Sequence, residues 1–391
     1  MAMTESVHTV RWIRQLQGQE WDLHLYPSRE AGEAHVELEG VTVHQGIVGS
    51  RKGMHPKLKV KGIRTLSRLN ERLARGVIRK VAPDYHRDGL VRTIRALKPD
   101  VVHSMEIQAA GYLTLDAREK LAGRFPPWIV TNWGSDIYLF GRLPEHRDRV
   151  RAVLGACDFY SCECERDVQL AREFGFAGSV LPVVPNSGGY DLERAVALRS
   201  PGKTSTRRLV LLKGYQNWAG RALVALRAIE LAADALRGYR IAIYGASTRD
   251  VRIAAELLRQ STSLDIELVP PLPYQDMLRL FGQARVAVGL SISDAISTLV
   301  LESMVMGAFP IQSCTSCASE WVTDGKTGML VPPNDPEPVA AAIRRAVTND
   351  PLVNSAAEEN LRVARARLDA GRIREIAIQM YETASALLIR A

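Results

Sequence analysis

The segment that most constrains the fold is a buried strand that leads directly into a short helix. The apolar run 286–290 is continuous, as expected for a parallel strand covered on both faces. A helix of about three turns follows and ends at Gly307, and a second apolar run begins at Phe309. Doubly wound α/β folds bind their ligands where a strand feeds a helix at its carboxyl end. The sequence therefore predicts such a fold, with a ligand site at the start of this helix.

Two carboxylates bracket the start of the helix, Asp294 before it and Glu302 on it, with seven residues between them. The first amides of a helix are unpaired and partly positive, which suits a phosphate, whereas carboxylates accept hydrogen bonds from sugar hydroxyls. This pattern predicts a nucleotide-sugar site, and an ordinary acidic pair beside a core helix is the alternative. The expected first-turn contacts to the donor are Ile296, Ser297, Thr298 and Leu299.

This region resembles the retaining glycosyltransferases of family 4, which have the GT-B fold of two facing Rossmann-like domains. The family signature is Glu, seven residues, Glu, a small-residue helix that ends in Gly, and a strand that begins near Pro. The resemblance continues through residues 320–333. It implies that Glu302 holds the nucleotide ribose and that Asp294 contacts the transferred sugar. Asp294 is one methylene shorter than the usual Glu, and Ala295 and Ser297 stand where Gly is usual.

Two basic residues are candidates for contact with the donor diphosphate. Lys213 follows the apolar run 209–212, and Arg221 precedes a predicted helix, whereas the family has the two residue types in the opposite order. Either side chain can neutralise phosphate charge, and a solvated Lys and Arg is the alternative. Gly245, which ends another apolar run, is a weak sign of nucleotide binding. The sequence has no Asp-x-Asp pattern, so we expect no metal and no cofactor besides the donor.

The first half of the chain is expected to provide the acceptor side. Parallel strands are predicted at 101–103 and 128–131. Family members often carry a His-Gly pair after the second strand, and this chain has Trp-Gly there. A lone histidine at a strand end is more often structural. His8 and His103 are therefore interpreted either as acceptor contacts or as structural residues. The acceptor-side candidates are His8, His103, Trp133, Gly134 and Asp136.

The resemblance also predicts the domain organisation. We expect an acceptor-side Rossmann-like domain at 1–200, a nucleotide-sugar domain at 201–370, and a C-terminal helix at 371–391 that crosses back to the first domain. The turn-rich segment 199–205 is the predicted linker. The family's opening strand has no counterpart before the helix predicted at 8–16. We therefore expect the natural chain to begin upstream, unless another segment fills that sheet position.

The positive charge of the chain is concentrated in one segment. The formal net charge is +8, and residues 51–80 hold eleven Lys or Arg against the single acid Glu71. After a Lys-rich loop, an amphipathic basic helix is predicted from Ile63 onward. It suits an anionic membrane or a polyanionic acceptor, with a solvated face as the alternative, and it lacks the aromatic residues typical of single-stranded nucleic-acid binding. Its basic face comprises Arg64, Arg68, Arg72, Arg75 and Arg79.

Composition excludes several classes of protein. The chain of 391 residues is 46% hydrophobic and 24% charged, and no apolar run approaches the roughly 20 residues needed to span a bilayer. No secretory segment follows Met1, so we expect a cytoplasmic protein, peripheral to the membrane at most. Cys314 and Cys317 are compatible with half of a zinc or redox site, but reduced structural thiols are the favoured interpretation.

The predicted function is transfer of a sugar from a nucleoside diphosphate, UDP or GDP, to a hydroxyl of a glycan or lipid-linked acceptor, with retention of configuration. The resemblance implies a front-face mechanism in which the leaving phosphate deprotonates the acceptor. A nucleotide-sugar epimerase of the same fold is one alternative. A catalytically weak paralogue that uses the basic segment for docking is the other.

Overall fold

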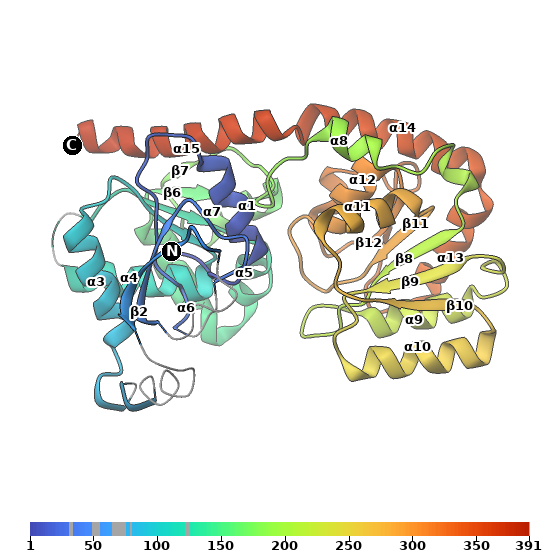
Figure 1. Cartoon of the computed structure of the whole chain (residues 1–391), viewed down its shortest axis with the longest axis horizontal. Helices are drawn as coiled ribbons and strands as arrows, with labels where there is room; N and C mark the ends of the chain where they lie inside the picture. The colour runs from blue at the N-terminus through green and yellow to red at the C-terminus, as the bar shows by residue number, and fades with distance from the viewer. Residues whose placement is uncertain are drawn as a thin grey trace. The chain divides into compact units, whose positions relative to one another are not determined.

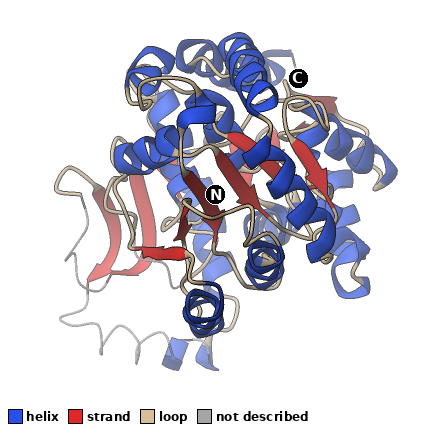
Figure 2. Cartoon of the chain, turned by 90° about the vertical axis from the view of Figure 1, so that its right-hand side faces the viewer, coloured by secondary structure: helices blue, strands red, loops and turns tan. Residues whose placement is uncertain are grey.

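The structure, a computed structural model, describes residues 1–30, 34–48, 55–64, 76–78, 80–121, 123 and 125–390. It divides into two compact units, Met1–Gly188 with Ile373–Ala391, and Gly189–Arg372. Each unit contains parallel strands flanked by helices (Figures 1 and 2). The chain first passes from unit 1 to unit 2 after Gly188, and not in the predicted linker 199–205. The reason is that residues 189–199 already pack on unit 2: Tyr190, for example, donates its backbone N–H to Leu368 at 2.7 Å and belongs to the core there.

Unit 2 has a six-stranded parallel sheet in the order β10-β9-β8-β11-β12-β13. Numbered within the unit this is 3-2-1-4-5-6, the order of Rossmann-type folds. Its topological switch point lies between β8 and β11, where Leu212 is in register with Val288. The strands are β8 (Leu209–Lys213), β9 (Arg240–Tyr244), β10 (Asp265–Val269), β11 (Val286–Gly289), β12 (Phe309–Ser313) and β13 (Met329–Val331).

Two apolar clusters fill the two faces of this sheet. One joins the sheet to α9, α10, α13 and the start of α14, and the other joins it to α8, α11, α12 and the end of α14. The continuous apolar strands of the sequence are explained by this burial on both faces. The helices and turns are α8 (Leu192–Ala197), η3 (Thr204–Thr206), α9 (Ala222–Leu231), α10 (Arg249–Thr262), α11 (Tyr274–Gln283), α12 (Thr298–Met306), η4 (Cys317–Glu320), α13 (Pro336–Thr348) and α14 (Asp350–Arg367).

The helix α12 is buried along almost its whole length and ends, as predicted, at Gly307, which has φ 76°. Two guanidinium groups cap its last carbonyls. Arg199 Nε donates to the Val305 carbonyl at 2.9 Å, and Arg207 Nη1 donates to the Met306 carbonyl at 3.1 Å. Burial lowers the pKa of Arg199 and of Arg207 to about 10, so both stay charged at neutral pH. Their charge complements the negative end of the helix dipole.

In unit 1 the described strands form a sheet in the order β4-β5-β6-β7 and a second in the order β1-β2-β3. Met1 and Ala2 lie between the two sheets. Ala2 pairs in parallel with Pro27, and Met105 donates its N–H to the Met1 carbonyl at 2.9 Å. The sheet position expected to lack a strand is thus occupied by these two residues. The strands are β1 (His24–Leu25), β2 (Thr42–Val48), β3 (Lys59–Arg64), β4 (Val102–Met105), β5 (Trp128–Thr131), β6 (Phe159–Ser161) and β7 (Ser179–Val180).

The helices of unit 1 cover both faces of the sheet β4-β5-β6-β7. The last helix, α15, packs Ile373, Ala377 and Met380 into the same apolar cluster as Val10 and Ile13 of α1. The helices are α1 (Val7–Leu16), α3 (Tyr85–Leu97), the π-helix η1 (Ile107–Gly111), α4 (Tyr112–Leu121), α5 (Ser135–Tyr138), η2 (Phe140–Arg142), α6 (Pro144–Ala156), α7 (Glu165–Glu173) and α15 (Ala370–Arg390).

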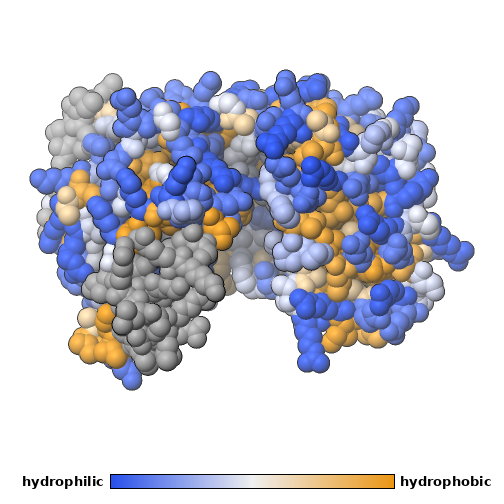
Figure 3. Space-filling view, in the orientation of Figure 1, coloured by the Kyte–Doolittle hydropathy of each residue, from blue (hydrophilic) through white to orange (hydrophobic). Residues whose placement is uncertain are grey.

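The prediction for the basic segment is wrong at its start. The strand β3 runs through Arg64, so the helix predicted from Ile63 does not begin there, and part of the predicted Lys-rich loop is strand. Residues 65–75 and 79, which carry most of the predicted basic face, lie outside the described residues. No described helix is both long and apolar enough to cross a membrane. Over the face shown in Figure 3, hydrophilic and hydrophobic residues are interspersed on both units.

Candidate active site

The start of α12 lies at the switch point of the unit 2 sheet. The strand β11 ends at Gly289, and the loop that follows leads to Ser297, the N-cap residue of α12. Within the described residues the Ser297 side chain makes no capping bond to the helix backbone. The first-turn amides, those of Thr298 and Leu299 among them, have no partners within the helix. Donors and positive potential are therefore available where a ligand of this fold binds.

Lys213 is brought to the same place by the neighbouring strand. It ends β8, which pairs with β11, and its Nζ lies 3.5 Å from Ser297 Oγ. The ammonium group also lies 4.7 Å from the centre of the Tyr215 ring, which restricts its position. A lysine beside a helix N-terminus forms an anion site, because both contributions are positive and both supply N–H donors.

The two predicted acids come before and after Ser297 in the chain. Glu302 is 8% exposed and lies on the second turn of α12. It is close to Tyr244, the last residue of β9: burial raises the pKa of the Tyr244 hydroxyl, and the negative charge of Glu302 raises it further. Asp294 is half-buried in the loop before the helix. The segment thus carries one buried acid on the helix and one acid in the loop before it, and ionised carboxylates accept hydrogen bonds.

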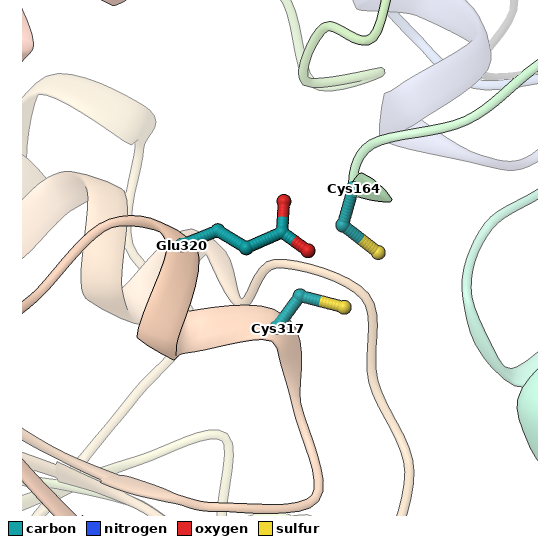
Figure 4. Close-up of side chains that lie close together, drawn as sticks. All are labelled: Cys164, Cys317 and Glu320. Atoms are coloured by element: carbon teal, nitrogen blue, oxygen red, sulfur yellow. The ribbon is translucent and has the colours of Figure 1, made fainter. Parts of the chain in front are cut away.

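The loop between β11 and α12 is held by hydroxyl groups at and just after the end of β12. The Ser291 N–H donates to Ser313 Oγ at 3.0 Å, and the Thr315 hydroxyl donates to the Ser291 carbonyl. The loop is also fixed by the η4 turn, since Cys317 donates its N–H to the Ala295 carbonyl at 2.8 Å. Figure 4 shows Cys317 at one end of that turn and Glu320 at the other. Ile296 packs its side chain into the core, so it offers only its backbone to a ligand.

Arg221 lies beside the site, and its side chain is held by hydrogen bonds to two loops. Its backbone N–H donates to the Leu290 carbonyl at 3.0 Å, which places the residue next to the loop between β11 and α12. Its Nε donates to Asn334 Oδ1 at 3.0 Å, and its Nη1 donates to the Gly220 carbonyl at 2.9 Å. In this structure Arg221 therefore joins two loops at the edge of the sheet.

Gly245 is required by the backbone and by its neighbour. Its φ is 69°, and a Cβ atom there would lie 2.4 Å from Tyr215 Cε1. The glycine allows the Tyr215 ring to pack over the end of β9, from where it also contacts Lys213. Tyr215, Tyr244 and Asn334 were not among the predicted site residues, and only their positions at or shortly after the ends of strands would have indicated them.

In unit 1, two buried carboxyl groups follow β4 and β5. Asp136 accepts from the Ile107 N–H at 3.2 Å and from the Trp133 N–H at 3.0 Å. Glu106, which sequence reasoning did not assign to the site, accepts from the Ala109 N–H at 2.9 Å and has an unusual φ of 87°. Burial, together with the negative charge of Glu106, raises the pKa of Asp136 to about 7.

The remaining acceptor-side candidates separate into two places. His8 and Trp133 lie together, with ring centres 5.6 Å apart, and Gly134, with φ 92°, begins α5. His103 is buried: Nδ1 is 2.6 Å from the Tyr381 hydroxyl and Nε2 is 2.6 Å from Thr131 Oγ1. Burial lowers the pKa of His103 to about 3, so it is neutral. Because both ring nitrogens of His103 are hydrogen-bonded within the chain, the structure favours the structural interpretation of this residue over acceptor contact.

Two family models match the chain by sequence. The model described as glycosyl transferases group 1 matches residues 207–349, which lie in unit 2. The model described as glycosyl transferase 4-like matches residues 87–157, which lie in unit 1. A comparison with curated proteins finds no match.

Solved structures resemble the chain over most of its length. Sucrose-phosphate synthase of Thermosynechococcus elongatus is 17% identical, with a TM-score of 0.64 and 90% of each chain covered. HepE of Anabaena in complex with UDP-glucose is 14% identical, with a TM-score of 0.64, over 88% of this chain and 92% of HepE. The α,α-trehalose 6-phosphate synthase of Burkholderia multivorans is 15% identical, with a TM-score of 0.65, over 94% and 96%. With glycosyltransferase models matching both of its units, the chain is a glycosyltransferase with the GT-B fold.

Proposed function

We propose that the chain transfers a sugar from a nucleoside-diphosphate donor, UDP- or GDP-linked, to a hydroxyl of a glycan or lipid-linked acceptor, with retention of configuration. The observation that carries the proposal is the position of Lys213 Nζ, 3.5 Å from Ser297 Oγ at the N-terminus of α12. The similar HepE structure is a complex with UDP-glucose, which supports a nucleotide-sugar donor. The acceptor, the retention and the independence from metal are parts of the proposal.

In the proposed reaction, the bond between the sugar C1 and the diphosphate oxygen breaks, and a bond forms from C1 to the acceptor oxygen on the same face. The acceptor proton passes to the leaving diphosphate. Lys213 and the first-turn amides of α12 stabilise the charge that develops on the diphosphate, and they are in place before the reaction begins. Glu302 accepts from the ribose hydroxyls, and Asp294 accepts from the transferred sugar. Charge on the leaving group is thus offset by the chain itself, without a metal or a cofactor.

The test is a donor panel in which nucleotide release is followed with and without acceptors. Lys213→Met is expected to weaken UDP or GDP binding by about 1.5–3 kcal/mol, because a charged partner of the diphosphate is lost. The matched control is Lys203→Met, which makes the same charge change at an exposed position of unit 2. Equal diphosphate affinities for the two variants would contradict the donor site.

The same panel separates the alternatives. A changed sugar on an intact nucleotide, with no acceptor product, would identify an epimerase. Failure to bind any donor would favour the alternative in which the protein is a catalytically weak paralogue that acts as a docking module. The anomeric configuration of an isolated product tests retention, and transfer that stops after chelation of divalent cations would contradict the metal-independent part of the proposal.

We further propose that the protein is cytoplasmic and that residues 51–80 bring it to an anionic membrane surface. The support is the concentration of eleven Lys or Arg in that segment. Each basic residue near such a surface contributes about 1 kcal/mol, screened by salt. Charge reversal of Arg68, Arg72 and Arg75 should abolish binding to phosphatidylglycerol vesicles. Reversal of the exposed residues Lys203, Arg237 and Lys326 is the control, and equal loss in both triple variants would contradict a specific role of the segment.

A further inference from the structure

We propose that a pocket of unit 1 binds a phosphate group with a hydroxyl-bearing substituent, as in a glycerol phosphate. The proposal goes beyond the proposed function, because this pocket belongs to unit 1 whereas the donor is assigned to unit 2, and it can be tested without sugar transfer. The pocket has a volume of about 400 Å³ and is lined by residues of β2, β3 and α3. Among them are Lys61 from the strands and Arg92 from the helix, and no carboxylate is among the described residues that line it.

The strand wall of the pocket carries a cation beside a histidine. His44 of β2 and Lys61 of β3 are in register on neighbouring parallel strands, which lie about 5 Å apart, so both side chains point to the same face of the sheet. Lys61 is exposed, and its side chain makes no hydrogen bond or ion pair with any described residue. Burial lowers the pKa of His44 to about 4, and the positive charge of Lys61 contributes to that shift. The Lys61 ammonium group is therefore close to the His44 ring.

His44 supplies an acceptor to the pocket. His24 Nε2 lies 3.0 Å from an Asp22 carboxylate oxygen and therefore carries a proton, because a carboxylate can only accept. His24 Nδ1 lies 2.8 Å from His44 Nε2. In the neutral His24 ring Nδ1 accepts, so His44 Nε2 donates to it and His44 Nδ1 is left as an acceptor. No described residue donates to His44 Nδ1, which suits this nitrogen to a hydroxyl of a ligand.

The helix wall carries the second cation, Arg92. A Cβ atom at Gly89 would lie 2.4 Å from the Tyr26 hydroxyl oxygen and 3.8 Å from Arg92 Nη2, so the guanidinium group lies near that hydroxyl. Tyr26 also lines the pocket, and its hydroxyl donates to the His86 carbonyl at 2.8 Å. Arg92 is exposed, and its side chain has no hydrogen-bond or ion-pair partner among the described residues. The donors of its guanidinium group are thus available to a ligand in the pocket.

The charges favour an anion in this pocket. A compact cavity of about 400 Å³ is about 9 Å across, which is less than the Debye length of about 10 Å at 0.1 M salt. An anion between the two walls is therefore attracted by both cations, and no single group has to contact both. Two acids lie near the pocket, Asp22 and Glu30, but neither lines it. A phosphate supplies charge and acceptors for the cations, and a hydroxyl on its substituent supplies the donor that His44 Nδ1 lacks.

The experiment uses the full chain at pH 8 and measures binding of sn-glycerol 3-phosphate, methyl phosphate, glycerol and dihexanoyl phosphatidylglycerol by calorimetry. Tighter binding of glycerol 3-phosphate than of the lipid identifies a soluble polyol phosphate, the reverse identifies a lipid headgroup, and both support the site. Lys61→Gln and Arg92→Gln are each expected to weaken that binding about tenfold, because a charge-assisted hydrogen-bond donor is lost. His44→Phe should weaken binding of glycerol 3-phosphate but not of methyl phosphate, which has no hydroxyl at this pH. Equal losses for the two phosphates would overturn the hydroxyl contact.

The matched controls lie on the same two elements. Lys59→Gln removes an exposed lysine of β3, Arg95→Gln removes an exposed arginine of α3, and neither residue lines the pocket. Both should leave phosphate binding unchanged. UDP and GDP affinities should stay the same in every variant, so that failure of this site is distinguished from failure of the donor site, and melting curves establish that each variant is folded. The proposal is overturned if the phosphates bind no more tightly than glycerol, or if Lys61→Gln or Arg92→Gln binds them as tightly as its control.

Discussion

The two units use the carboxyl edge of a parallel sheet in opposite ways. In unit 1, the backbone amides that follow the strands donate hydrogen bonds to carboxylates of the chain. Glu106 accepts from Ala109, and Asp136 accepts from Ile107 and Trp133. In unit 2, the N-cap Ser297 makes no side-chain capping bond within the described residues, and a lysine lies beside it instead. Amides satisfied internally cannot bind an external anion. The comparison indicates why the diphosphate is assigned to unit 2, although both units share the same strand–helix arrangement.

The largest expected effect comes from removing a carboxyl group of unit 1 that accepts hydrogen bonds from backbone amides. Asp136→Ala removes the acceptor of two N–H groups and leaves them buried, which should lower the free energy of unfolding by about 3 kcal/mol. Urea unfolding measures it, with Asp136→Asn as the milder variant that keeps an acceptor. UDP or GDP affinity of the folded variant should not change, and a parallel loss of donor affinity would contradict the division of roles between the units.

Making unit 2 resemble unit 1 is the converse test. Ser297→Asp supplies a capping carboxylate to α12, which should stabilise the helix but oppose the diphosphate. Donor affinity is expected to fall by about 2 kcal/mol while the melting temperature is unchanged or higher. Calorimetry with UDP and GDP, together with thermal unfolding, gives both quantities. Ser297→Asn is the control, because it caps without the negative charge and should retain most of the affinity.

Glu302→Ala sharpens the comparison by removing the acid of unit 2 that is proposed to bind the nucleotide ribose. The loss of ribose hydrogen bonds should weaken nucleotide binding by about 1.5 kcal/mol. Deoxyribose nucleotides provide the internal control, because they should lose less affinity than ribose nucleotides. A folded Glu302→Ala protein with unchanged affinity for UDP and GDP would contradict its assignment to the ribose.

The last effect, which is the smallest when it is expressed per pH unit, is the pH dependence of unit 1. Burial raises the pKa of Asp136 to about 7, so the folded state holds its proton at a pH at which the unfolded state has released it. The contribution of Asp136 to stability is therefore greatest below about pH 4 and declines as the pH rises toward 7, by up to about 1.4 kcal/mol per pH unit. The difference in unfolding free energy between the wild type and Asp136→Asn, measured from pH 4 to 8, should show this decline. A flat difference would mean that Asp136 is ionised throughout.

Much of unit 2 follows from sequence pattern. The apolar run of β11, the helix after it and the stop at Gly307 are confirmed, because burial on both faces and a left-handed C-terminal residue have local sequence signatures. The contact of Lys213 with Ser297 does not follow in the same way. It depends on the pairing of β8 with β11, which joins residues far apart in the chain.

The structure of unit 1 is less predictable from the sequence. Glu106 has a positive φ that its residue type does not favour, and its carboxylate turns back onto amides that only the fold brings near. Met1 and Ala2 enter a sheet position through partners as distant as Pro27 and Met105. No periodicity marks either feature, because both are contacts between segments and not properties of one segment.

The arginines behind α12 alter the electric field in front of it. A helix alone has roughly half an elementary charge of opposite sign at each end, and the two contributions partly cancel at a distance. Arg199 and Arg207 place two cations against the negative end, at the carbonyls of Val305 and Met306. The positive charge of the two side chains exceeds that of the negative pole, so the positive field at the other end is no longer partly cancelled at a distance. An incoming diphosphate is therefore attracted from farther away than the nine residues of α12 would achieve without those two side chains.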